Sequence, residues 1–260
     1  MRIAREVQIC RAFVVAALLE TLRRREVFVL LVLSVFMVLG AYSFTFFGVH
    51  GLELFVKDMG FSSVGLFSSV LGVAVAARQL PEEIQRRTIY PLLARPITRW
   101  QLLLGKFAAA WVTCAVSFTA LSLVVVLLLT LLRIPPGWIF LQFLYSRYLG
   151  FMWLCGFVIF LSTVLSSSGA FTIGLLLTLG SGVFTRLLMF IDGTSGTMKI
   201  LLTPFCAFLP QYSLFDLTKK LVYGWEPVHP VAILGLTLYG VAISLFWLRM
   251  AWLRLRYQAV

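Results

Sequence analysis

Charged side chains are scarce in this chain of 260 residues, where they make up 12% of the sequence. Soluble domains average ~25% charged and ~45–50% apolar residues, whereas hydrophobic residues reach 61% here and the mean hydropathy is +0.99. A soluble domain of this length has no core large enough to bury so much apolar surface. The composition therefore predicts an integral membrane protein, and it argues against a soluble enzyme, a disordered chain and a disulfide-stapled secreted domain.

Histidine and cysteine, which supply many metal sites, are also few. The two histidines, His50 and His229, stand isolated in the sequence, which argues against a metal site built from several imidazoles. We interpret the four cysteines as small apolar fillers of the fold. They are Cys10, Cys114, Cys155 and Cys206. We therefore predict neither a metal site nor a cofactor site in this chain.

Nucleotide-binding and hydrolase motifs are missing as well. A Walker A loop needs Gly-x-x-x-x-Gly-Lys-Ser/Thr, but the pair Gly105-Lys106 is followed by Phe107, and Trp100 stands where the first glycine should be. No Gly-x-Ser-x-Gly elbow occurs, and no predicted span carries the paired carboxylates of a proton relay. A membrane transferase would have to use outer-side residues without recognisable spacing, namely Asp192, Asp216, Glu226 and His229. We predict that the chain is not catalytic by itself.

The chain is instead rich in long apolar runs, and a transmembrane helix needs ~20 mostly apolar residues. Six runs are candidate spans: Val27–Phe47, Phe61–Ala77, Lys106–Leu132, Arg147–Leu165, Gly169–Phe190 and Pro230–Leu248. In the second run, Ser68, Gly72 and Ala76 form a stripe of small residues that suits close helix packing, with a pore-lining role as the alternative. We predict an all-α integral membrane protein with six transmembrane helices in one domain, residues 1–260.

The placement of basic residues predicts the orientation of these spans. Six spans put the N-terminus, the 78–106 loop, the 166–168 turn and the C-terminus on one side, together with 15 of the 22 Lys and Arg residues. The positive-inside rule makes this side, with both termini, cytoplasmic. The net charge of +12 is then explained by topology and anionic membrane lipid, without a nucleic-acid partner. Residues 1–26 are predicted to form an amphipathic elbow helix along the cytoplasmic face.

The 78–106 segment (RQLPEEIQRRTIYPLLARPITRWQLLLGK) is the most informative cytoplasmic sequence. Pro81 suits the first turn of a helix. Glu82 and Glu83 would place negative charge at the positive end of that helix dipole. We expect this short helix to begin at Pro81 and to run to about Leu93.

The second half of the segment predicts a turn and a new helix. Pro96 disfavours a helical conformation in the residue before it. Thr98 and Gln101 form a capping-box pattern at the head of the third span. The whole segment therefore reads as a helical hairpin, and its apolar residues among charges favour docking into a groove of a cytoplasmic partner. A helix that lies on the bilayer surface is the alternative.

This hairpin resembles the coupling segment of ABC exporter permeases of the type 2 family. The shared pattern is a Glu, an Arg-Thr pair, Leu-Leu-x-Arg-Pro-Ile-Thr-Arg, and Gly-Lys at the head of the third span. The best match is the branch with the permease of the nitrous-oxide-reductase maturation system and the gliding-motility permeases, to which the outer stretch 209–217 (LPQYSLFDL) is also similar. The resemblance assigns ATPase coupling to Glu82, Glu83, Arg86, Arg87, Thr88, Ile89, Tyr90, Leu92, Leu93, Arg95, Pro96 and Arg99.

The resemblance implies the permease subunit of an ABC transporter in a prokaryotic cytoplasmic (inner) membrane. Two permease copies, as a homodimer, would pair with two separate cytoplasmic ABC ATPase subunits that bind ATP and Mg. ATP hydrolysis would export or extract a substrate, or drive a partner protein. Path-lining side chains are implied only as small or aromatic residues such as Ser68, Phe171 and Thr178. The alternative is a membrane scaffold that recruits a cytoplasmic partner without transport, and the substrate stays open.

The extracytoplasmic segment, residues 191–229, is long enough to hold short helices before the last span. One candidate is Ser213–Tyr223, in which Leu214, Leu217, Thr218 and Leu221 share a face. We expect this helix to be either a lid over the exit of the path or a platform for an extracytoplasmic partner protein.

Overall fold

A computed structural model describes residues 52–85, 98–131, 137–193 and 211–257, with scattered helical positions between 15 and 43. The elements of the continuous ranges are helices: α3 (Leu52–Gln85), α5 (Arg99–Leu131), α6 (Ile139–Val164), α7 (Ser167–Gly193), η2 (Tyr212–Phe215), α9 (Thr218–Tyr223) and α10 (Pro230–Tyr257). Over the described residues, the prediction of an all-α protein is therefore confirmed.

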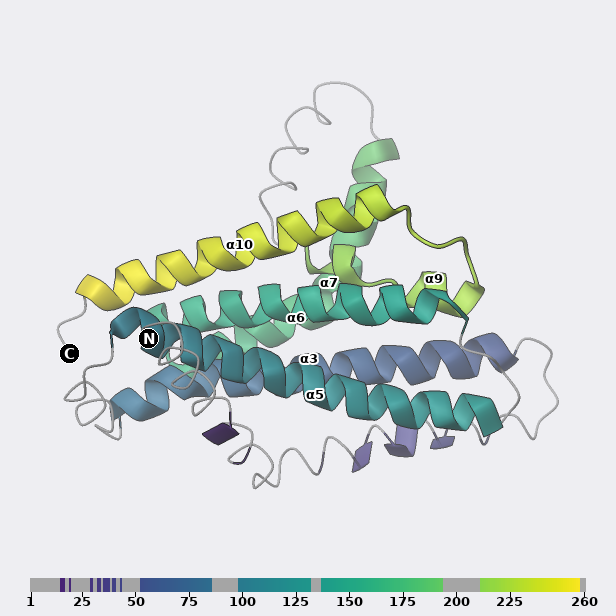
Figure 1. Ribbon diagram of the computed structural model, residues 1–260, viewed down its shortest axis with the longest axis horizontal. Coiled ribbons are helices and arrows are strands. Elements are labelled where there is room, and N and C mark those ends of the chain that lie inside the picture. Colours follow the sequence, from purple (N-terminus) through teal and green to yellow (C-terminus); the bar gives the residue numbers. More distant parts are fainter. Residues whose placement is uncertain are drawn as a thin grey trace, which may run out of the picture.

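The long helices lie side by side, with α6 between α10 on one flank and α3 and α5 on the other (Figure 1). Helix α7 packs against α3 and α6 and is steeply inclined to them. The end of α3, the start of α5 and the end of α10 gather at one end of the bundle, which we call the hairpin end. Helix α9 and the starts of α3, α6 and α10 gather at the opposite end, the outer-segment end. Successive long helices therefore run alternately from one end of the bundle to the other, as the predicted topology requires.

Four described helices are long and apolar enough to cross a membrane, namely α3, α5, α6 and α10. Their apolar windows match the second, third, fourth and sixth predicted spans. The fifth predicted span corresponds to α7, in which Ser167–Ser181 is the apolar helical stretch among the residues with described side chains. The first predicted span lies outside the described residues apart from scattered helical positions. The structure supports a multi-pass membrane protein, and the number of six spans stays a prediction.

The helix expected to begin at Pro81 is a wrong prediction, because Pro81 lies inside α3, which continues to Gln85. An internal proline removes one backbone hydrogen bond. Burial of the surrounding turn offsets that loss, since Ala77 and Leu80 are 0% and 1% exposed. Glu82 and Glu83 therefore stand in the last turn of α3, where the dipole is negative, and the predicted dipole role of these two residues is wrong as well.

The core of the bundle is centred on α6. Phe143 and Phe151 of this helix meet Phe118 of α5 with ring centroids 5.6 and 5.2 Å apart, and Phe61 of α3 lies 5.4 Å from Phe143. All four rings are fully buried. Aromatic rings prefer edge-on and offset arrangements over face-to-face stacking, and these contacts follow that preference. The four rings thereby join α3, α5 and α6 in one core.

The small-residue stripe of α3 packs against α5. Ser68 and Ala76 are 1% and 0% exposed, and a Cβ atom on Gly72 would stand 1.8 Å from Cys114 Sγ of α5. Only glycine lets the two helices approach so closely at this point. The burial of the stripe favours the packing interpretation over a pore-lining role.

Candidate functional site

The predicted coupling hairpin is described only at its two flanks. Glu82 and Glu83 belong to the last turn of α3, and Arg99 begins α5. The other predicted coupling residues lie outside the described residues: Arg86, Arg87, Thr88, Ile89, Tyr90, Leu92, Leu93, Arg95 and Pro96. Most of the predicted elbow helix, residues 1–26, lies outside them too. The docking of the hairpin residues and the elbow helix both stay predictions.

The capping box at the exit of the hairpin is confirmed. The amide of Thr98 donates to Gln101 Oε1 at 3.0 Å, and the amide of Gln101 donates to Thr98 Oγ1 at 3.3 Å. This reciprocal pair satisfies two donors that a helix start leaves without partners. The point at which the chain leaves the hairpin and enters α5 is therefore fixed by local chemistry.

Arg99 makes a contact that the sequence analysis missed. Its Nη1 donates to the backbone oxygen of Leu255 at 2.7 Å and to that of Arg256 at 3.4 Å. Both acceptors are in the last turn of α10, where carbonyl groups lack partners within the helix. The start of α5 is thereby tied to the end of the last span, and no local sequence pattern predicts this pairing.

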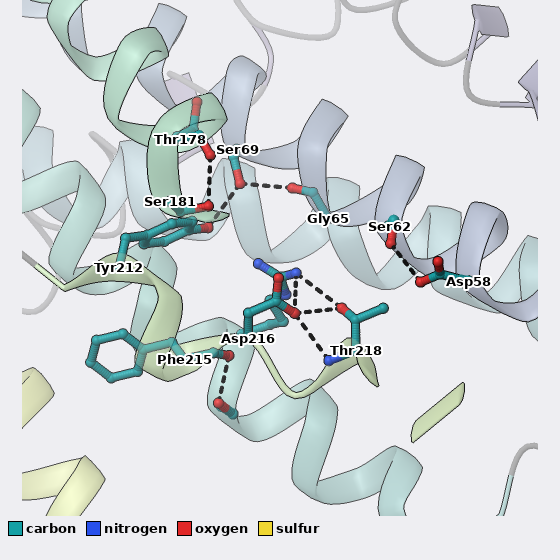
Figure 2. A network of polar contacts seen from close by, with 12 residues as sticks. Asp58, Ser62, Gly65, Ser69, Thr178, Ser181, Tyr212, Phe215, Asp216 and Thr218 are labelled. Carbon is teal, nitrogen blue, oxygen red and sulfur yellow. Dashed lines mark hydrogen bonds and ion pairs between the residues drawn. The ribbon is translucent and has the colours of Figure 1, made fainter. Parts of the chain in front are cut away.

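The outer segment enters the bundle instead of lying on it. Tyr212 of η2 is 4% exposed, and its hydroxyl lies 2.8 Å from Ser69 Oγ, near the middle of α3 (Figure 2). The same ring stacks at 6.0 Å on Trp153, near the middle of α6. Non-helical backbone is tolerated at such depth only where protein surrounds it. The segment 211–217 is therefore re-entrant, and the role of Ser213–Tyr223 as a lid or a platform stays a prediction.

A buried ion pair anchors this re-entrant segment. Arg147 of α6 contacts Asp216 through Nη2 and Oδ1 at 2.6 Å, and the two side chains are 6% and 37% exposed. Asp216 Oδ1 also accepts from the amide and the hydroxyl of Thr218, at 3.0 and 2.5 Å (Figure 2). Arg147 in turn donates to Thr218 Oγ1 at 3.1 Å. Three residues from two segments thus form one closed polar triangle.

The electrostatic balance of this triangle keeps Asp216 ionised. Burial by itself raises the pKa of this carboxyl group, but the positive charge of Arg147 and the hydrogen bonds from Thr218 and Arg147 outweigh it, so the pKa is lowered from its ordinary value of 3.8. A carboxylate held in this state at neutral pH is a poor general acid. The ion pair and its hydrogen bonds therefore suit Asp216 to anchor the segment.

Further contacts seat the segment between helices. Ser146 Oγ donates to the backbone oxygen of Phe215 at 2.6 Å. The Phe215 side chain is fully buried against two glycines, because Cβ atoms on Gly150 of α6 and Gly240 of α10 would stand 2.9 and 3.2 Å from it. Glycine at these positions opens the notch that the aromatic ring fills.

The start of α10 is held to α6 as well. Gln142 donates from Nε2 to the backbone oxygen of Val228 at 3.2 Å, and the amide of Val228 donates back to Gln142 Oε1 at 2.9 Å. One amide side chain thus satisfies both backbone groups of a residue that no helix includes. Helix α6 therefore holds the outer segment at several points along its first half.

The single helix expected over Ser213–Tyr223 is wrong. The chain forms η2, then an extended residue at Asp216, then the short helix α9. Asp216 breaks the helix because its carboxylate binds Arg147 and accepts a hydrogen bond from the amide of Thr218. Aspartate side chains favour such bonds to nearby backbone amides, which compete with the hydrogen bonds of a helix. The predicted shared face is divided accordingly, with Leu221 buried and Leu214 45% exposed.

Two of the other outer-side candidates have described side chains, and both lie at the surface. Glu226 and His229 are exposed, and His229 Nδ1 accepts from the amide of Val231 at 3.4 Å. The side chain of Asp192 lies outside the described ones. The described residues also contain no cluster of three or more metal-ligating side chains. A search for opposite charges could have found the pairing of Arg147 with Asp216, because Arg147 is the single charge in the fourth predicted span.

These features define a multi-pass helical membrane protein with a re-entrant outer segment. The family model described as ABC-2 family transporter protein matches residues 20–185. This match covers more than half of the chain, so the chain belongs to the ABC-2 transporter family and is the permease subunit of an ABC transporter. A search of curated proteins found no match.

Proposed function

We propose that this chain is the membrane half of an ABC exporter whose ATP hydrolysis takes place in separate cytoplasmic ATPase subunits. The observation that carries the proposal is the family match over residues 20–185, which includes the whole 78–106 hairpin. The hairpin leaves α3 and enters α5 at the same end of the bundle. It joins two helices that pack on each other and on α6, so a force on it is delivered to the core of the bundle.

In this proposal the hairpin end is the cytoplasmic side. The basic residues of 249–256 lie there, as the positive-inside rule requires. Two permease copies and two ATPase subunits form the complex, and ATP and Mg bind to the ATPase subunits. The outer-segment end then faces the extracytoplasmic side. The family branch of the nitrous-oxide-reductase maturation and gliding-motility permeases is part of the proposal.

Charge reversal in the hairpin tests the coupling. Glu82→Lys/Glu83→Lys places two positive charges where two acids are proposed to face the ATPase subunit. Truncation or reversal of a charge in a docked pair costs ~2–5 kcal/mol, against ~0–1 kcal/mol for an exposed pair. We expect the variant to insert normally into the membrane, to lose most co-purifying ATPase subunit, and to lose the corresponding ATPase activity.

Glu226→Lys is the matched control, because it reverses an exposed acid between α9 and α10, and α9 and the start of α10 lie at the opposite end of the bundle. It should leave both the co-purification and the ATPase rate at wild-type levels. Wild-type binding and rate in the double hairpin variant would show that the hairpin is not the coupling element. A wild-type chain that binds a cytoplasmic protein without ATPase activity would favour the scaffold function instead.

The copy number has its own measurement. Two differently tagged copies of the chain, expressed together with the ATPase subunit, should co-purify in one complex. The mass of that complex should correspond to two permeases and two ATPase subunits. A complex with a single permease copy would contradict the proposed homodimer.

A further inference from the structure

Arg99 stands at a position that local helix rules disfavour. It is the first residue of α5, at the positive end of the helix dipole, and the first turn of α5 has no acidic residue to offset the charge. A residue that breaks a local rule without local compensation is a candidate for a functional or tertiary role. The compensation here comes from a helix that is distant in the sequence.

The guanidinium group of Arg99 reaches the opposite kind of helix end. Its hydrogen bonds to the oxygens of Leu255 and Arg256, at 2.7 and 3.4 Å, place the cation at the negative end of the α10 dipole. They also satisfy two of the last carbonyl groups of α10, which have no partner within the helix. The surroundings are packed, since Ala251 and Leu255 are 0% and 8% exposed. The contact is thus a charge-assisted hydrogen bond at a place where the surrounding side chains partly exclude water.

An aromatic contact joins the same two turns independently. The rings of Trp100 and Trp252 meet edge to face, with centroids 6.3 Å apart and an interplanar angle of 88°. The guanidinium groups of Arg249 and Arg256 lie 5.3 and 5.7 Å from the centroid of the Trp252 ring. The first turn of α5 and the last turns of α10 are therefore held together by polar and aromatic contacts at once.

We infer that Arg99 is a positioning residue that makes α10, as well as α5, follow the hairpin. The inference rests on the proposed function and assigns Arg99 a partner within the chain, in place of the direct ATPase contact that the family resemblance implied. The capping box fixes the hairpin exit to α5, and Arg99 fixes it to α10. At its far end α10 begins next to Val228, which Gln142 of α6 holds. Displacement of the hairpin thus reaches the outer-segment end along two helices.

Hydrogen exchange in lipid nanodiscs tests the contact without any ATPase subunit. Arg99→Gln removes the charge and the fork of donors, so exchange in peptides over residues 98–106 and 250–257 should rise about ten-fold, as expected for a lost hydrogen bond to a charged group. Arg254→Gln is the matched control, because it removes an exposed positive charge from the same turn of α10. It should leave both peptides unchanged. Equal exchange in Arg99→Gln and the wild type would overturn the inference.

The coupling role is measured in the complex with the co-purified ATPase subunit. Arg99→Gln should retain ATPase binding and lose about ten-fold in ATP hydrolysis rate, while Arg254→Gln keeps the wild-type rate. Arg99→Lys retains the cation but not the planar fork, so it should recover part of the rate. If Arg99→Gln shows increased hydrogen exchange but a wild-type rate of ATP hydrolysis, Arg99 only stabilises the structure. That result would overturn its positioning role. A wild-type chain that binds no ATPase subunit would instead refute the proposed function, and the inference with it.

Discussion

Replacement of Asp216 by asparagine is the sharpest test of the re-entrant segment. The change keeps the size of the side chain and an oxygen that can accept from Thr218, and it removes only the negative charge. Arg147 then remains 6% exposed beside a neutral group, and its Nε has no hydrogen-bond partner among the described residues. Gly65 lets this guanidinium lie against α3, since a Cβ atom there would stand 3.0 Å from Nη2. The guanidinium group is thus closely packed against α3.

The size of the effect lies between two limits. Loss of one partner of a fully buried ion pair costs ~3–5 kcal/mol, and loss of an exposed pair costs ~0–1 kcal/mol. Asp216 is 37% exposed while Arg147 is buried, which places this pair between those limits, at ~2–3 kcal/mol. If that free energy is lost from closure of the segment, local opening rises by about 30- to 150-fold.

The assay is hydrogen exchange of peptides over residues 211–224 in nanodiscs, together with thermal unfolding in detergent. Asp58→Asn is the matched control, because Asp58 is an exposed acid whose described contact is a hydrogen bond from Ser62 at 3.2 Å. Arg147→Met combined with Asp216→Asn should recover most of the loss, since two neutral groups replace a broken pair. Exchange in Asp216→Asn that matches the Asp58→Asn control would refute the anchoring role.

The same pair predicts how stability depends on pH. The pKa of Asp216 is lowered in the folded chain from an ordinary value of 3.8, so the stabilisation is complete above the ordinary value and is lost as the pH falls through the lower, folded value. The wild type should therefore approach the stability of Asp216→Asn only in strong acid. A loss of the difference between the two proteins above pH ~5 would contradict this assignment.

Two further predictions concern packing and topology. Gly72→Ala should lower the stability by ~1–3 kcal/mol, because its Cβ would stand 1.8 Å from Cys114 Sγ. In a double variant, Cys114→Ala should restore the stability that Gly72→Ala loses. Gly235→Ala is the control, because a Cβ there has no atom within 4 Å, so it should have little effect by itself. A Gly72→Ala protein as stable as the wild type in thermal unfolding would contradict the close approach. In a background without the four native cysteines, a cysteine at exposed Tyr223 should react with an impermeant thiol reagent from outside, and one at Arg254 only after permeabilisation; labelling of both from outside would reject the orientation.

Composition and apolar run length were sufficient to predict a helical membrane protein and the approximate positions of four long spans. Both signals depend on the summed transfer of side chains into the bilayer, which needs no knowledge of partners. The capping box of Thr98 and Gln101 was predictable for a related reason, since its atoms lie within one turn of chain. The hairpin motif likewise led to the family that the match over residues 20–185 shows.

Contacts between distant segments were beyond such local signals. Pro81 looked like a helix start, yet burial of α3 against its neighbours carries the helix through it. The sequence suggested no partner for Arg147, yet Asp216 meets it inside the bundle and breaks the helix expected around Leu217. Arg99 is unfavourable at the start of α5 by local helix rules, and its hydrogen bond to the end of α10 compensates for this. In each case the free energy that decides the conformation comes from a partner far away in the sequence, so only the tertiary structure identifies it.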